Sequence, residues 1–183
     1  VKDFNADWNV NYYAAGTAIV DDIVVRRFPV RRRDTAAFDR VNRKLMQGQR
    51  LSLQEEQTFV EEMVNSPQLY EYMLDSSDDY SLYVFIPYMF GTTYFGMQIC
   101  PEKSVLIPCF HDEAYLYLRL FRQAYIQARG MIYNAMPEME LAGRVYDFSS
   151  TEQICMGIGI GAAKIPDRHQ QVQEIQELLV DTD

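Results

Sequence analysis

The sequence predicts an α/β protein with a mostly parallel sheet and helices on both faces of that sheet. Four short apolar runs alternate with longer segments whose apolar residues recur at helical spacing. The runs are continuously apolar, which is typical of parallel strands that are buried on both faces. At 183 residues the chain is most simply one domain. The expected strands span 82–86, 105–107, 131–133 and 154–158.

The first half of the chain predicts one strand and three helices. Residues 1–16 mix Asn, Asp and aromatic residues without periodicity and are expected to form a loop. The β-branched run 23–28 is expected to be a strand that ends at Pro29. Each helix has its own start signal. These signals are Asp34 as the N-cap of a helix over 35–46, Ser52 and Glu55 as a capping box, and Ser66 followed by Pro67.

In the second half, helices over 113–127 and 137–146 are expected to connect the strands in right-handed crossovers. The tail 166–180 carries apolar residues at helical spacing among Gln and Glu, which predicts a polar amphipathic helix. We therefore expect one domain over residues 1–161, followed by a linker and helix over residues 162–183.

Composition argues against several classes of protein. The formal net charge of −9 and the pI near 4.7 disfavour a nucleic-acid partner, since phosphate contacts need a cationic face. Three cysteines without a C-x-x-C pair and only two histidines disfavour a disulfide scaffold and a zinc site. No apolar run reaches the ~18 residues of a membrane span, and the first residues do not resemble a signal peptide. We therefore expect a cytoplasmic location.

Five arginines form a basic cluster in this acidic chain. Such a run is most often a solvated face, but it also suits an anionic acceptor, the headgroups of a membrane surface or an acidic partner. The cluster comprises Arg26, Arg27, Arg31, Arg32 and Arg33.

A polar triplet, His111, Asp112 and Glu113, follows the expected strand 105–107. Ligands of parallel α/β sheets bind outside the carboxyl ends of the strands, so a functional side chain belongs here. His111 can serve as a hydrogen-bond partner or as a general base for a hydroxyl or phosphate group. Alternatively, the two carboxylates only cap the next helix and complement its dipole, while His111 is solvated.

The junction after 82–86 contains Gly91, Thr92 and Thr93. Gly91 permits a tight turn, and the threonines supply hydroxyl and backbone N–H groups at a helix start, which suits an anionic or hydroxylated ligand. The alternative is a loop that packs its aromatic side chains on the core.

A third junction, after 131–133, contains Asn134 and Glu138, and helix capping alone would explain both residues. Because the carboxyl ends of parallel strands share one edge of the sheet, we expect His111, Thr92 and Asn134 to line one cleft.

A glycine run, Gly157-Ile158-Gly159-Ile160-Gly161, superficially matches a dinucleotide-binding loop. The fingerprint requires a helix after G-x-G-x-x-G and an acidic residue ~20 positions further on, and Lys-Ile-Pro follows here instead. A hinge after the last strand explains the run better.

Taken together, four segments carry a resemblance to a known family. They read DYSLYVFIPYMFGTTYFGM, KSVLIPCFHDEAYLYL, ARGMIYNAMPEMELAGRVY and ICMGIGIG. The set resembles the N-terminal domain of the family 4 GT-B glycosyltransferases, where a strand and a His-Asp-Glu triplet precede a helix, and a strand with Asn or Ser precedes Pro-Glu. The run IVVRRFPVRRRD is similar to that domain's third strand and the loop after it. The resemblance covers nearly the whole chain and is strongest over residues 79–161.

The resemblance implies a Rossmann-like domain that forms one half of a GT-B fold. It implies transfer of a sugar from a nucleoside-diphosphate sugar to a hydroxyl acceptor, with retention of configuration and with neither a metal nor another cofactor. The implied roles are catalysis for His111, Asp112 and Glu113, substrate binding for Gly91, Thr92, Thr93, Asn134 and Glu138, and a donor-side hinge for Gly157 and Gly159.

Three features of the family have no match in this chain. These are the first strand with its Gly-rich loop and helix, the acidic residue at the position of Gly161, and the second Rossmann-like domain whose cations bind the donor diphosphate. We therefore expect a fragment that is inactive alone, and a homodimer that covers the sheet edge left without a partner. A non-catalytic Rossmann-like interaction or scaffold domain is the alternative.

Overall fold

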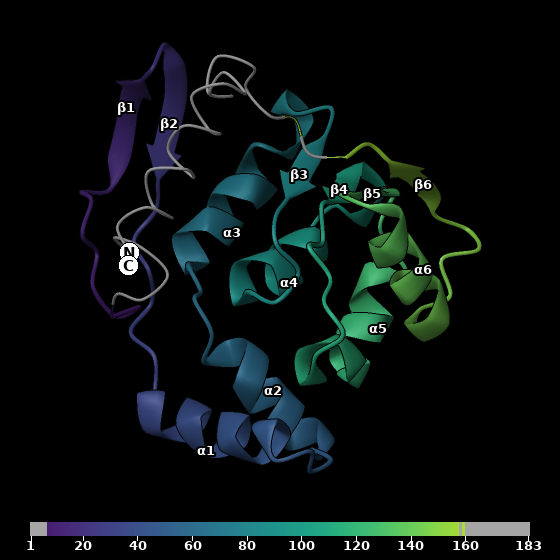
Figure 1. Cartoon of the computed structure of the whole chain (residues 1–183). Coiled ribbons are helices and arrows are strands. Elements are labelled where there is room, and N and C mark those ends of the chain that lie inside the picture. The colour runs from purple at the N-terminus through teal and green to yellow at the C-terminus, as the bar shows by residue number, and fades with distance from the viewer. Residues whose placement is uncertain (1–6, 158, 160–183) are drawn as a thin grey trace, which may run out of the picture.

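The computed structural model describes residues 7–157 and 159, and it confirms the α/β class and the parallel sheet (Figure 1). Four parallel strands lie in the order β3-β4-β5-β6, which is also their order along the chain. The last strand begins and ends earlier than expected, and Gly157, two residues beyond its end, adopts a left-handed φ of +77°. The strands are β3 (Tyr83–Phe85), β4 (Ser104–Leu106), β5 (Gly130–Tyr133) and β6 (Glu152–Cys155).

The helix start signals are confirmed. Asp34 accepts a hydrogen bond from the backbone of Ala37, and Ser52 and Glu55 form both bonds of a capping box. The helices are α1 (Thr35–Met46), α2 (Leu53–Glu61), α3 (Pro67–Asp75), α4 (Gly91–Met97), α5 (Arg119–Tyr125) and α6 (Met136–Val145). Short 3-10 turns are η1 (Ser77–Asp79), η2 (Pro101–Lys103) and η3 (Ala114–Tyr117).

The helix expected over 113–127 is divided into η3 and α5. Leu118 separates them with an extended backbone, φ −63° and ψ 132°. The side chain of Leu118 is buried, as is that of Leu116 two residues earlier. Burial of both leucines therefore outweighs the helical periodicity of the segment.

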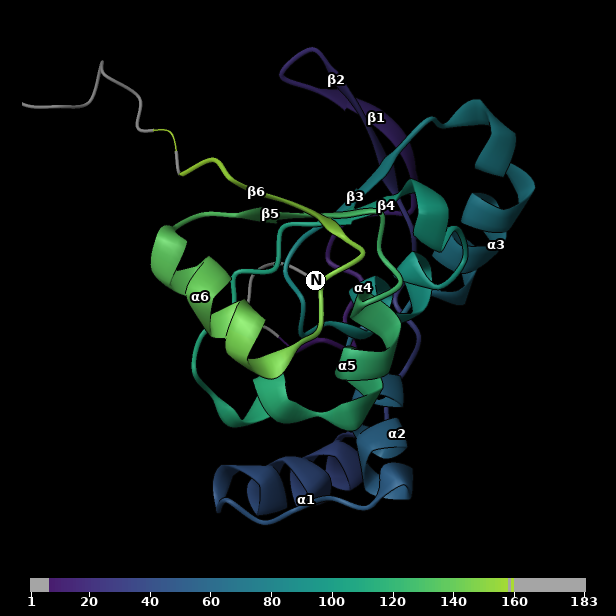
Figure 2. The same cartoon turned by 90° about the vertical axis from the view of Figure 1, so that its right-hand side faces the viewer.

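Helices α4, α5 and α6 all lie on one side of the sheet, which Figure 2 shows nearly edge-on. Right-handed crossovers between strands taken in consecutive order all fall on the same face, and this order explains the arrangement. Leu106, Met131 and Tyr133 on the covered face are buried, and they belong to the same hydrophobic cluster as Phe121 and Tyr125 of α5.

The opposite face of the sheet differs from the expectation that helices cover both faces. Val84, Ile86 and Ile154 lie on this face and are 54%, 59% and 54% exposed. Within residues 7–157 and 159, no helix packs over them and no strand pairs with the outer edge of β3. In doubly wound sheets the strand order reverses at one point, and this reversal places helices on the second face. Here that would require further strands on the outer side of β3. We call this surface the open face.

The strand expected over 23–28 forms, as β2 (Ile23–Arg27), but it does not join the parallel sheet. It pairs in an antiparallel hairpin with β1 (Gly16–Val20), a strand that the sequence analysis did not predict. Asp21 and Asp22 connect the two strands with φ of +48° and +63°, values that suit a two-residue hairpin turn. The likeness of this run to a third strand of the parallel sheet therefore does not hold in the structure.

The helix expected over 166–180, and with it the division at residue 162, lies outside the described residues. Among the helices that the structure does describe, none combines the length and the hydropathy of a membrane span.

Exposure of the two sheet faces gives a testable prediction for stability. Leu106→Ala removes a fully buried side chain from the helix-covered face, and we expect it to lower the free energy of unfolding by about 2–5 kcal/mol. Ile154→Ala, on the open face, should cost no more than about 1 kcal/mol. Urea denaturation of both variants measures the difference. Equal losses would mean that the open face is covered in solution.

Candidate functional site

The loop after β4, residues 107–113, carries the His-Asp-Glu triplet, and we call it the triplet loop. On one side it is held by Tyr88, from the loop after β3. The backbone N–H of Tyr88 donates to the carbonyl of Pro108 over 3.0 Å, and the Tyr88 hydroxyl donates to Glu113 Oε1 over 2.7 Å. Burial, followed by the Glu113 hydrogen bond and charge, raises the pKa of Tyr88, so its hydroxyl stays a donor.

On its other side the triplet loop is held by the junction after β5. Glu138, a buried residue of α6, accepts from the backbone N–H of Phe110 at Oε1 and from that of Asn134 at Oε2, both over 2.8 Å. The Asn134 amide also donates to Cys109 Sγ over 3.5 Å. The N-cap of α6 is Ala135, which forms no side-chain cap. Glu138 therefore ties two loops together, which goes beyond the helix-capping interpretation.

Cys109 has a left-handed backbone, with φ of +56°, at the point where the chain leaves β4. A non-glycine residue is uncommon there, and the conformation turns the triplet loop sharply away from the strand. Burial raises the pKa of the Cys109 thiol, which favours its neutral form. Sequence reasoning missed the roles of Cys109 and Tyr88, since neither lies in a motif of the triplet type.

The triplet itself divides into an anchored and a free part. Glu113 is bound to Tyr88 and is the N-cap residue of η3, but its side chain makes no capping bond. Asp112 does not cap either, because its Oδ1 accepts from the Tyr117 hydroxyl over 2.7 Å. His111 is exposed, and within the described residues its imidazole has no hydrogen-bond partner. An imidazole on a loop held from both sides can give or take a proton at a ligand hydroxyl.

The residues after β3 have mainly internal contacts. A Cβ on Gly91 would lie 2.4 Å from Asn65 Nδ2, so this close approach requires glycine. Thr93 is buried and its hydroxyl donates to the carbonyl of Pro87 over 2.7 Å. Thr92 lines a groove of about 360 Å³ between α3 and β3.

The structure therefore brings Asn134 and Glu138 into direct contact with the triplet loop. Thr92 belongs to the groove beside β3, and that groove is lined by neither His111 nor Asn134. Gly157 and Gly159 follow β6, where a Cβ on either would meet no atom within 4 Å.

The arginine cluster is largely occupied by contacts within the chain. Arg26 lies over the ring of Tyr72 and Arg27 over that of Tyr13, at 4.3 and 5.1 Å from the ring centroids. Arg31 pairs with Glu62 at 3.1 Å. Arg33 lies between Trp8 and Phe38, and burial lowers its pKa despite nearby carboxylates. Contact of this cluster with a membrane or an acidic partner remains a prediction.

Within the described residues, no three His, Cys, Asp or Glu side chains gather in a way that could hold a metal ion. No protein-family model matches this chain, and the searches of curated proteins and of solved structures give no match either.

The double acceptor role of Glu138 gives the second prediction. Glu138→Gln keeps the shape but turns one acceptor into a donor that faces a backbone N–H, and we expect a loss of about 1–3 kcal/mol in the free energy of unfolding. Glu140→Gln is the matched control, because it makes the same change at an exposed position of the same helix. Equal stability of the two variants in thermal and urea denaturation would contradict the bridging role.

Proposed function

We propose that this chain is the acceptor-side part of a GT-B-type glycosyltransferase that moves a sugar from a nucleoside-diphosphate sugar to a hydroxyl acceptor, with retention of configuration. One observation carries the proposal: an exposed imidazole lies on a loop that Tyr88 and Glu138 hold from both sides. The likeness of the triplet and of the Asn and Pro-Glu residues after β5 to family 4 enzymes adds the reaction class.

Sugar transfer from a nucleotide donor depends on placing the acceptor and on stabilising the charge of the departing diphosphate. In this proposal His111 contacts the donor sugar or assists the acceptor hydroxyl, and Glu113 fixes its loop. Thr92 lines the groove beside β3, and in this proposal that groove holds part of the acceptor. The cations for the diphosphate come from a second Rossmann-like domain, so the 183 residues alone should turn over negligibly.

The third prediction tests this role of His111 in a polypeptide that joins this chain to the proposed second domain. Incubation with a panel of nucleotide sugars and hydroxyl acceptors should release nucleoside diphosphate, and His111→Ala should lower the rate by about 10²–10⁴-fold. The variant should fold normally, because the side chain is exposed and forms no hydrogen bond or ion pair within the described residues. Gln127→Ala, at an exposed position two residues after α5, is the control and should leave the rate unchanged.

Two results would reject the enzyme proposal. One is wild-type turnover with none of the nucleotide sugars, and the other is robust transfer by the 183 residues alone. A rate that is insensitive to His111→Ala would leave sugar transfer standing and remove His111 from it.

A second candidate function, an interaction module, is favoured by the open face. Val84, Ile86 and Ile154 expose apolar side chains beside the unpaired edge of β3, and such edges readily pair with another chain. In this alternative the chain forms a two-fold homodimer through that surface.

The fourth prediction concerns this homodimer. Sedimentation velocity of the chain at micromolar concentration should show a dimer, and Ile154→Asp should shift it to monomer because a charge on the open face opposes burial there. Gln127→Asp, exposed outside that face, should leave the dimer intact. A wild-type monomer over this range would reject self-association through the open face.

A further inference from the structure

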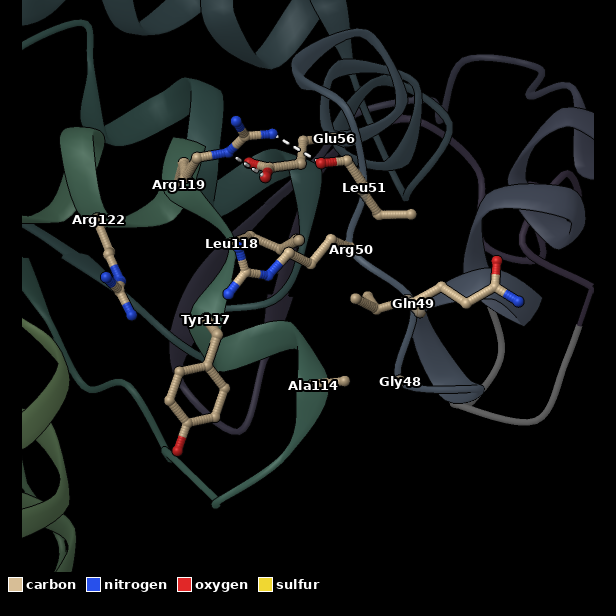
Figure 3. A pocket seen from close by; sticks show the side chains of 11 residues that line it. Gly48, Gln49, Arg50, Leu51, Glu56, Ala114, Tyr117, Leu118, Arg119 and Arg122 are labelled. Carbon is tan, nitrogen blue, oxygen red and sulfur yellow. Dashed lines mark hydrogen bonds and ion pairs between the residues drawn. The ribbon is translucent and has the colours of Figure 1, made fainter.

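A cavity of about 610 Å³ lies between the turn that joins α1 to α2 and the segment that runs from η3 into α5 (Figure 3). Three arginines line it: Arg50 comes from the turn, and Arg119 and Arg122 come from α5. Leu51 and Leu118 add buried apolar side chains to its wall. We call this cavity the arginine pocket. The proposed function makes no use of it.

One of the three arginines is already neutralised. Arg119 Nε donates to Glu56 Oε1 over 2.8 Å, and its Nη2 donates to the carbonyl of Leu51 over 2.7 Å, as the dashed lines in Figure 3 show. The second oxygen of Glu56 accepts from the backbone N–H of Leu120 over 3.0 Å. The Glu56 side chain is only 5% exposed. This ion pair, whose carboxylate is buried, fixes one wall of the arginine pocket.

The other two arginines are uncompensated. Within residues 7–157 and 159, neither the Arg50 nor the Arg122 side chain forms an ion pair or a hydrogen bond, and both residues are exposed. Glu56 is the one carboxylate in the described lining, and it is committed to Arg119. Three arginines against one glutamate leave an excess of two positive charges, in a chain whose net charge is −9.

Charges around the rim do not cancel this excess. The acidic neighbour Asp112 accepts from the Tyr117 hydroxyl over 2.7 Å, and this bond raises the pKa of Tyr117. The positive charges of Arg144 and Arg122 lower the pKa of Tyr117. Arg144 therefore brings a further positive charge to that side of the pocket. At this part of the rim the charges of Arg144 and Asp112 offset each other, so the positive excess of the lining remains.

Two arginines at a concave wall suit a ligand that carries a phosphate group. The guanidinium fork binds phosphate oxygens in pairs, and its charge persists at all physiological pH values. A phosphate monoester carries about −1.5 to −2 charges near pH 7, which matches the excess. The volume of the cavity falls within the roughly 300–1,000 Å³ of small-molecule sites. It is larger than a bare phosphate ion would fill.

We propose that the arginine pocket binds a small molecule with a phosphate monoester, of the size of a sugar or polyol phosphate. Arg50 and Arg122 bind the phosphate, and Arg119, held by Glu56, positions the wall against which the rest of the ligand lies. The assignment is independent of sugar transfer, because it uses no residue of the triplet loop.

The test is calorimetric titration of the full chain with inorganic phosphate, glucose 6-phosphate, glucose and phosphatidylglycerol vesicles. We expect both phosphates to bind, glucose 6-phosphate more tightly, and glucose and vesicles not to bind. Affinity should fall with rising salt, since the contacts are ionic. Absence of binding by both phosphates, or binding by vesicles alone, would overturn the proposal.

The fifth prediction assigns the site to its residues. Arg50→Gln and Arg122→Gln should each weaken glucose 6-phosphate binding at least tenfold, and the double variant should abolish it. Both side chains are exposed and unpaired within the described residues, so the variants should keep the wild-type unfolding midpoint. Arg129→Gln, which removes an exposed arginine outside the lining, is the charge-matched control and should bind as wild type does. Equal weakening by the control would show a non-specific charge effect and reject the site.

Discussion

A single buried carboxylate organises the carboxyl edge of the sheet. Glu138 is accommodated in the interior because each of its oxygens accepts a backbone N–H, from Phe110 and from Asn134. A carboxylate with these bonds is stabilised where an unbonded one would be costly. Since the two donors belong to the loops after β4 and β5, the same bonds that satisfy the charge also fix the triplet loop. Tyr88 completes the arrangement from the β3 side.

The order of the strands determines both what is covered and what is left open. Consecutive parallel strands with crossovers of one hand place α4, α5 and α6 on the same face, so the other face has no covering helix among residues 7–157 and 159. The same order makes the loops after β3, β4 and β5 neighbours, which allows Tyr88 and Glu138 to reach the triplet loop. The fixed position of the triplet loop and the open face are therefore two consequences of one topology.

Local signals in the sequence predicted much of the fold. The capping box of Ser52 and Glu55 formed as expected, and the four apolar runs became neighbouring parallel strands, because both depend on short-range pattern and burial. The hairpin turn was missed because Asp21-Asp22 is a less usual sequence for a left-handed turn than one with glycine. The predicted 113–127 helix failed at Leu118, where tertiary burial outweighs helical periodicity.

The site was harder to predict than the strands. Glu138 bonds to a backbone group 28 residues away, and Arg119 meets Glu56 across 63 residues, and no spacing rule reveals such contacts. The basic cluster was also hard to interpret from the sequence. Its arginines look like a charged surface there, but in the structure aromatic rings and Glu62 contact several of them. Position near a strand end identifies a candidate residue, but only the packed structure separates Glu138, which is buried and holds a loop, from His111, which is exposed.

Amide hydrogen exchange, followed by NMR, tests most directly whether the triplet loop is held from both sides. The bonds to Glu138 predict that the amides of Phe110 and Asn134 exchange slowly, at rates like those of β4 and β5, while the amides of His111 and Asp112 exchange quickly. Glu138→Gln should accelerate the two slow amides and leave the strands protected. If Phe110 exchanges as fast as His111 in the wild-type chain, the loop is not fixed, and the account of a preorganised site is wrong.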